Sequence, residues 1–152
     1  MTDLDYSGDI DPKESWNLLK SNEDSYLIDC RTKAEWQFVG IPDLESINRK
    51  ILLIEWQVYP SMLQNHQFLD EVSKANIKKD SNIILICRSG GRSRSAAQFL
   101  TSQGYKNCFN CLHGFEGEHN LNGHRGIVNG WKFSNLPWKQ IKNGRRDKSK
   151  LS

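Results

Sequence analysis

A cysteine stands at residue 87, where a run of apolar residues gives way to arginine, glycine and serine. Residues 87–93 read CRSGGRS. The two adjacent glycines permit backbone angles closed to other residues, so successive N–H groups can converge on an anion. A helix N-terminus and nearby arginines favour the thiolate form of a cysteine, and the thiolate is the nucleophile. The segment therefore predicts Cys87 as a nucleophile inside an anion-binding loop.

The arginines of this loop indicate the kind of substrate. Arg88, Arg92 and Arg94 each carry a planar guanidinium group that can bind an oxyanion in a bidentate manner. A sulfur oxyanion, phosphate or arsenate would suit such a loop. The spacing from Cys87 to Arg92 is C-x4-R, whereas thiol-based phosphatases use C-x5-R, and Ser93 stands at that position here. The shorter loop favours one extra sulfur atom on the cysteine over a phosphoryl group.

The other three cysteines favour packing over chemistry. Cys108 and Cys111 form one C-x-x-C pair with His113 nearby, but four-ligand zinc sites need more ligands than this. Free cysteine is also a small, commonly buried residue. Cys30 follows Asp29 at the end of an apolar run, where it could resolve Cys87 as a disulfide. Since strand side chains alternate between faces, we favour packing for Cys30 as well.

A strand before the loop and a helix after it would position the cysteine. Residues 81–87 (SNIILIC) show no polar alternation, which is typical of a strand buried on both faces. Residues 93–104 predict a helix that Ser93 caps and Gly104 ends. A further strand is expected over residues 105–112. In open α/β sheets, ligands bind outside the carboxyl ends of the strands, which is where this loop would lie.

The N-terminal third repeats the alternation of helix and strand. A helix is expected over residues 12–20, a strand over residues 25–30, and a second helix directly after that strand. Both helix starts carry the capping-box spacing, with Asp11 paired to Glu14 and Thr32 paired to Glu35. This alternation indicates an α/β fold with a largely parallel sheet and right-handed crossovers.

The middle of the chain is less clear. Residues 51–56 (ILLIEW) fit a strand or a helix equally well. Beyond Pro60, residues 61–76 predict an amphipathic helix, because their apolar residues fall roughly on one helical face. These are Met62, Leu63, Phe68, Leu69 and Val72.

Length and composition fit one globular domain. The chain has 152 residues, of which 37% are hydrophobic and 26% charged. No apolar run approaches the length of a membrane span, and the acidic start does not resemble a signal peptide. Four irregularly spaced cysteines do not form a disulfide framework, so we expect a reducing compartment, the cytoplasm.

The positive charge is concentrated at the C-terminus. Residues 139–152 carry a net charge of +5, and because the whole chain is +3, residues 1–138 carry −2. A short basic run without interleaved aromatic residues is more often a flexible, solubilising tail than a nucleic-acid site. We therefore expect no nucleic-acid partner.

Two motifs together resemble the rhodanese-like sulfurtransferases. The CRSGGRS loop is similar to the six-residue active loop of that family, and LIDCRTKAEW (27–36) is similar to its other signature. The segments GIP (40–42) and GF…NGWKFSNLPW (114–138) resemble later landmarks. The resemblance covers residues 8–138 and implies a single rhodanese-like domain with about five mostly parallel strands flanked by helices on both faces.

The resemblance also implies an activity. Cys87 would take a sulfane sulfur from a donor such as thiosulfate, become a persulfide, and pass the sulfur to cyanide or a thiol. Asp29 and Arg31 would support the loop, whereas Arg88 and Arg92 would hold the sulfonate end of the donor. The active-site loop would comprise Arg88, Ser89, Gly90, Gly91, Arg92 and Ser93. No metal or cofactor is implied; a protein sulfur donor or acceptor is an open alternative, and we expect a monomer.

Two departures from the family and two other functions stay open. Gly40-Ile41-Pro42-Asp43 stands where the family has His-Ile-Pro-Gly, and residues 116–128 are longer than the usual crossing. Within that insertion, His119, His124 or Arg125 would touch a substrate if the segment folds over the pocket. A silent binding or regulatory module keeps the same fold without activity. A cysteine phosphatase or arsenate reductase is disfavoured by the loop length.

Overall fold

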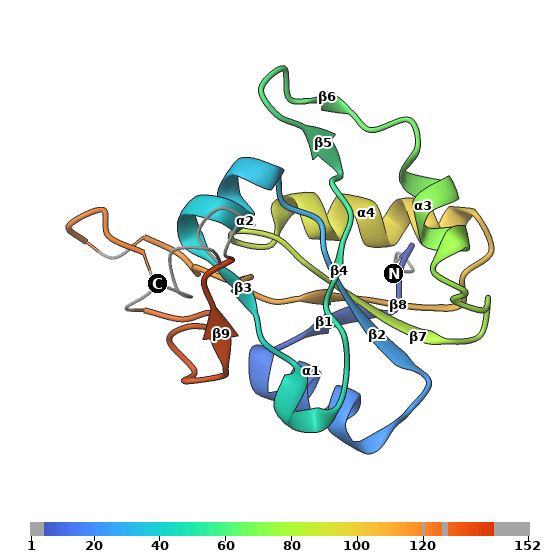
Figure 1. Ribbon diagram of the computed structural model, residues 1–152, viewed down its shortest axis with the longest axis horizontal. Helices are drawn as coiled ribbons and strands as arrows, with labels where there is room; N and C mark the ends of the chain where they lie inside the picture. The colour runs from blue at the N-terminus through green and yellow to red at the C-terminus, as the bar shows by residue number, and fades with distance from the viewer. Residues whose placement is uncertain (1–4, 120, 126–127, 142–152) are drawn as a thin grey trace, which may run out of the picture.

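Five parallel strands form the central sheet, in the order β1-β8-β7-β2-β4 (Figure 1). The structure is a computed structural model that describes residues 5–119, 121–125 and 128–141. The strands of the sheet are β1 (Gly8–Ile10), β2 (Ser25–Asp29), β4 (Leu52–Leu53), β7 (Asn82–Ile86) and β8 (Asn107–Cys111). The predicted α/β fold with a parallel sheet of about five strands is confirmed.

Helices cover both faces of this sheet (Figure 1). The described part of the chain contains four helices, α1 (Pro12–Ser21), α2 (Lys33–Val39), α3 (Phe68–Lys74) and α4 (Gly91–Ser102), and one 3-10 turn over Glu45–Ile47. Because strand side chains alternate, Ile83 and Leu85 of β7 pack with α3 and α4. Their neighbours Ile84 and Ile86 pack on the opposite face with Leu19 of α1. The absence of polar alternation in β7 thus reflects burial on both sides.

The strand register brings three chain segments together at one edge. Asp29 of β2 pairs with Ile86 of β7, and Leu85 of β7 pairs with Asn110 of β8. Since Cys87 directly follows β7, the carboxyl ends of these strands meet around it. Asp29 and Asn110 are polar and fully buried there. Buried polar groups need hydrogen-bond partners, so their presence at one edge of the sheet indicates a functional site.

Both predicted capping boxes are confirmed. Asp11 accepts a hydrogen bond from the Glu14 backbone, and Thr32 does so from Glu35. The helix after the loop, however, begins at Gly91 rather than at Ser93. Gly90 occupies the N-cap position in a left-handed conformation, so no serine side chain marks the start of this helix.

The predicted helix over residues 61–76 is wrong in its first half. The helix α3 starts only at Phe68, and before it β5 (Gln57–Val58) and β6 (Leu63–Gln64) form an antiparallel hairpin. Met62 lies in the turn with a positive φ of 59°, outside helical space. Met62 and Leu63 are exposed, so their apolar character does not reflect packing of a helix face. The ambiguous residues 51–56 contain the short edge strand β4.

A small sheet outside the central one holds the C-terminal part of the described chain. The strands β3 (Ile41–Pro42) and β9 (Trp138–Lys139) pair antiparallel, Ile41 with Lys139 and Pro42 with Trp138. Lys139, the first residue of the predicted basic tail, is therefore in a strand, whereas residues 142–152 lie outside the described residues. In the part of the chain that the structure describes, no helix is long and apolar enough to cross a membrane.

Candidate active site

The Cys87 sulfur lies in a cradle of hydrogen-bond donors. Its side chain is buried, with 1% of the residue exposed. The backbone N–H groups of Gly90 and Ser93 donate to Sγ at 3.2 and 3.3 Å, and the Ser93 hydroxyl lies 3.1 Å away. Donors converging on one sulfur from the first turn of a helix favour a negative charge on that sulfur.

A left-handed residue makes this cradle possible. Gly90 has a φ of 116°, which turns its N–H group back toward the sulfur just before α4 begins. A side chain is strained in this conformation, whereas glycine is not. Of the two adjacent glycines, Gly90 therefore adopts the left-handed conformation that the cradle requires, whereas Gly91 lies in the first turn of α4.

Backbone hydrogen bonds from the turn after β8 fix the position of the loop. Phe115 N donates to Cys87 O at 2.8 Å, and Glu116 N donates to Arg88 O at 2.9 Å. Gly114 has a φ of 62°, and a Cβ atom there would lie 2.5 Å from the Cys87 carbonyl oxygen. Only glycine allows the two chain segments to approach so closely.

Ser93 connects the sulfur to a buried polar chain. Its Oγ lies 2.5 Å from Asn110 Oδ1, and Asn110 Nδ2 donates to Asp9 Oδ1 at 2.9 Å. Because the amide must donate to the Asp9 carboxylate, its oxygen faces Ser93 and accepts the single hydroxyl hydrogen. A neutral Cys87 thiol can then donate to Ser93 Oγ, whereas a thiolate would draw the hydroxyl hydrogen toward itself. Ser93 can therefore serve both charge states of the sulfur.

Asp29 and Arg31 form a fully buried ion pair beside the loop. Arg31 Nη2 lies 2.7 Å from Asp29 Oδ2, and the same nitrogen donates to the Gly40 carbonyl at 2.7 Å. Burial opposes the charge on Arg31, but Asp29 outweighs this effect and raises the pKa of Arg31. The guanidinium carbon lies 4.3 Å from the centre of the Phe115 ring. The pair thus connects β2 to the C-terminal end of α2 and to the turn after β8.

Arg92 is paired with a residue that the sequence assigned only to a helix cap. Its Nη1 and Nη2 lie 2.7 and 2.9 Å from the two Glu35 carboxylate oxygens. Burial alone would raise the pKa of Glu35, but hydrogen bonding and charge from Arg92 lower it to about 2. The hydrogen bond to Glu35 raises the pKa of Arg92, so both groups are charged at neutral pH. The Arg92 charge is therefore already balanced, unlike the free cation expected from the sequence.

We expect the stability at acid pH to depend on Glu35. Because its pKa is near 2 in the fold and ordinarily 4.5, the contribution is complete above pH 4.5 and is lost as the pH falls toward 2. For this half-buried pair we expect a loss of about 2 kcal/mol. Urea unfolding across this pH range should show that extra loss in the wild type and not in Glu35→Gln. Equal losses in both proteins would contradict the assignment.

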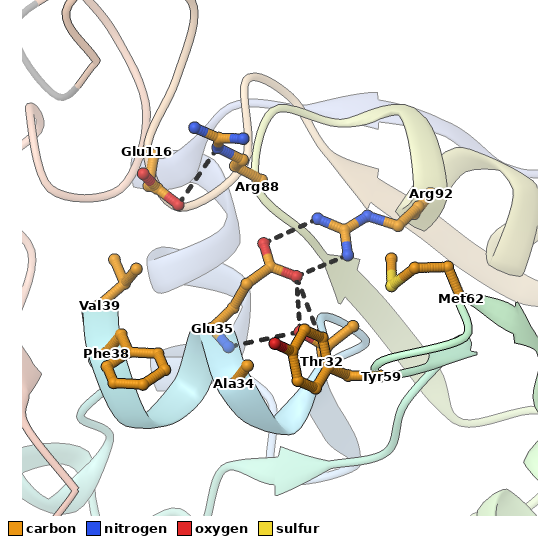
Figure 2. A pocket seen from close by; sticks show the side chains of 10 residues that line it. All are labelled: Thr32, Ala34, Glu35, Phe38, Val39, Tyr59, Met62, Arg88, Arg92 and Glu116. Carbon is orange, nitrogen blue, oxygen red and sulfur yellow. Dashed lines mark hydrogen bonds and ion pairs between the residues drawn. The ribbon is translucent and has the colours of Figure 1, made fainter.

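A cavity of about 500 Å³ opens beside the loop, between α2 and the β5–β6 hairpin (Figure 2). Arg88 and Arg92 stand on its loop side, and Glu116 faces Arg88 with a separation of 3.5 Å. Arg88 is the more open of the two arginines, with 47% of its side chain exposed, and Ser89 next to it is also exposed. The remaining lining residues are Thr32, Ala34, Glu35, Phe38, Val39, Tyr59 and Met62.

The other cysteines are buried and free, as predicted. Burial raises the pKa of Cys108 to about 11 and that of Cys111 to about 12, so both are neutral thiols. Burial also raises the pKa of Cys30, with the nearby Cys87 and Asp29 adding to the effect. Among the residues that the structure describes, no three histidine, cysteine or acidic side chains gather as a metal site would require.

Among the described residues of the insertion over residues 116–128, only Glu116 lines the cavity. Arg125 Nη1 donates to the Gly117 carbonyl at 2.6 Å, so this arginine closes the insertion on itself. His119 and His124 are described, but like Arg125 they are not part of the cavity lining. The structure thus does not bring these three residues to the loop.

The fold and the cysteine loop between β7 and α4 together define a rhodanese-like domain. Residues 8–145 match the model of the family described as "STR4 middle domain", and the chain belongs to this family of rhodanese-like domains.

Three similar proteins show how far the likeness extends. The uncharacterized protein RC0915 of Rickettsia conorii is 42% identical over 126 residues, 82% of this chain and 91% of that protein. A sulfurtransferase of Allochromatium vinosum is 30% identical over 102 residues, 67% of this chain and 78% of that protein. The crystal structure of Rv0390 from M. tuberculosis has a TM-score of 0.81 at 41% identity, and covers 90% of this chain and 99% of its own. A named sulfurtransferase is thus among the relatives.

Proposed function

We propose that this protein is a sulfurtransferase that moves a sulfane sulfur from an anionic donor such as thiosulfate to a thiol or cyanide. The observation that carries this proposal is the convergence of two backbone N–H groups and the Ser93 hydroxyl on Cys87 Sγ. These donors can stabilise the negative charge of a persulfide without any metal or cofactor. The sulfurtransferase of Allochromatium vinosum among the relatives supports the same reaction class.

The reaction would proceed in two displacements at sulfur. The Cys87 thiolate attacks the outer sulfur of thiosulfate, the S–S bond of the donor breaks, and sulfite leaves with the electron pair. The outer sulfur atom of the resulting persulfide carries the negative charge that the loop amides stabilise. An acceptor thiolate then attacks this outer sulfur, and Cys87 leaves as a thiolate. No oxidant or reductant is consumed over the cycle.

Mass spectrometry of the intact protein tests the proposal. Treatment with thiosulfate should add the mass of one sulfur atom, and cyanide should remove it with release of thiocyanate. Turnover of a phosphate ester without sulfur transfer would favour a cysteine phosphatase instead. Failure to react with either substrate would favour a binding or regulatory module that keeps the fold.

The proposal also includes the compartment, the oligomeric state and the partners of the enzyme. All four cysteines are free, which is consistent with the reducing cytoplasm. The loop and its donors come from one chain, so the proposed chemistry is possible in a monomer. A protein that carries a sulfane sulfur or accepts it is an alternative to a small donor or acceptor.

We expect Glu35→Gln to strengthen the binding of thiosulfate. Glutamine preserves the capping box with Thr32 but leaves the Arg92 charge unbalanced next to the cavity. The KM for thiosulfate should fall by about threefold at low salt, the size typical of a partly exposed charge pair. The effect should shrink at high ionic strength, because salt screens the added charge.

The matched control for this variant is Glu14→Gln. Glu14 has the same position in the capping box of α1 and is not part of the cavity lining. Its substitution should leave the KM for thiosulfate unchanged at every salt concentration. A KM that stays constant in Glu35→Gln as well would show that Arg92 does not contact the donor.

A further inference from the structure

The apolar wall of the cavity beside the loop is made of side chains from two elements, α2 and the β5–β6 hairpin, and it lies at the protein surface. Phe38 of α2 is 82% exposed, Tyr59 56% and Met62 40%, and Val39 adds to the same wall. Figure 2 shows Phe38 and Val39 on the helix and Tyr59 and Met62 on the hairpin opposite. Large apolar side chains that gather around a hollow, rather than lying scattered, commonly mark a ligand site.

The charged groups of the cavity cancel one another. Arg92 pairs with Glu35, and Arg88 Nε lies 3.5 Å from Glu116 Oε2. Two arginines and two glutamates therefore line the cavity with no net charge. A cavity selected for a doubly negative ion alone would leave its arginines unpaired, as charge complementarity requires. The electrostatics thus favour a substrate whose body is uncharged.

The size of the cavity also favours a small organic substrate. A volume of about 500 Å³ falls in the range of pockets for small organic ligands. An ion as small as thiosulfate fills only a part of it and makes no use of the apolar wall.

We propose that the cavity binds the organic body of a low-molecular-weight thiol acceptor whose body is an uncharged alkyl or aryl group. This inference rests on the proposed sulfur transfer and names the acceptor class for the same site. The acceptor sulfur faces the loop, and its carbon chain packs against Phe38, Tyr59 and Met62. The acceptor thiolate attacks the outer persulfide sulfur, Cys87 leaves as a thiolate, and the product is the organic persulfide.

A series of thiols, compared at equal thiolate concentration, tests the inference. With thiosulfate as the saturating donor, ethanethiol, propanethiol, butanethiol and 2-mercaptoethanol are compared as acceptors by release of sulfite. Burial of one methylene group contributes about 0.8 kcal/mol, which corresponds to about a fourfold change. We expect kcat/KM for the acceptor to rise by about twofold to fourfold with each methylene group. Hydroxyl-bearing 2-mercaptoethanol should be poorer than propanethiol.

Surface variants locate the effect in the cavity. In Phe38→Ser and Met62→Gln, the gain for each methylene group should fall toward unity. Phe133→Ser is the matched control, because Phe133 is 52% exposed but is not part of the cavity lining. This control should keep the full gain. The same flat dependence in all three variants and the wild type would overturn the inference.

Cyanide separates this inference from the proposed function, because it needs no apolar wall. If the wild type transfers sulfur to cyanide but shows no gain along the alkyl series, the proposed function stands and the acceptor class is wrong. If only a cysteine-bearing protein accepts the sulfur, the acceptor class is again wrong. If sulfur reaches neither cyanide nor any thiol, the proposed function itself fails.

Discussion

Replacing Cys87 with serine should abolish sulfur transfer, lowering kcat/KM for thiosulfate by at least about a thousandfold. A serine hydroxyl is far less nucleophilic than a thiolate and forms no stable sulfur adduct. The loop itself should keep its shape, because serine is close in size to cysteine and its oxygen can accept from the same Gly90 and Ser93 N–H groups. Sulfite release from thiosulfate and the intact mass after treatment measure the two parts of this prediction.

The control for this variant is Cys108→Ala. Cys108 is fully buried in the core, and its thiol donates to the Tyr105 carbonyl. Its loss should cost some stability but leave the sulfur adduct on Cys87, which peptide mapping can locate. A sulfur adduct that persists in Cys87→Ser, on Cys30 or another cysteine, would place the reactive thiol elsewhere in the chain.

Features encoded in a short stretch of sequence could be predicted. The apolar residues 83–86 indicated a buried strand, and the glycines that follow indicated a tight loop, since both signals come from neighbouring residues. The capping boxes at residues 11–14 and 32–35 are equally local, and the structure contains both. Local sequence alone is therefore enough to predict Cys87 as the candidate nucleophile.

Contacts between distant segments could not be predicted in this way. Glu35 carries one local signal, its capping box, which gives no indication that its carboxylate also binds Arg92, 57 residues away. Likewise, Asp9 reaches Asn110 only because β1 and β8 are neighbours in the sheet, and β1 itself was not predicted. The cavity has no net charge because Arg88 and Arg92 are paired with glutamates from distant segments. Since these pairings are not visible in the sequence, the sequence indicated free arginines.

The hairpin before α3 shows a different reason for failure. Met62 and Leu63 are apolar, and a helical pattern assumes that apolar residues are buried. Here they are exposed, and Met62 together with Tyr59 lines the cavity beside the loop. An apolar residue that is kept for a ligand gives the same sequence signal as one kept for the core. The error therefore falls on a segment that we assign to the acceptor.

The buried pair of Asp29 and Arg31 should have the largest effect on stability. We expect Arg31→Met to lower the free energy of unfolding by about 3–5 kcal/mol, because it leaves the Asp29 carboxylate buried without its partner. The substitution also removes the hydrogen bond to the Gly40 carbonyl. Urea unfolding at neutral pH, followed by tryptophan fluorescence, measures the change.

Two further variants show whether this loss of stability comes from the unpaired charge of the Asp29 carboxylate. Glu45→Gln breaks the exposed pair with Lys139 and should cost less than about 1 kcal/mol. Adding Asp29→Leu to Arg31→Met removes the unpaired carboxylate, and the double variant should recover much of the stability. If Arg31→Met costs no more than Glu45→Gln, then the buried pair does not support the loop, and the expected role of both residues is wrong.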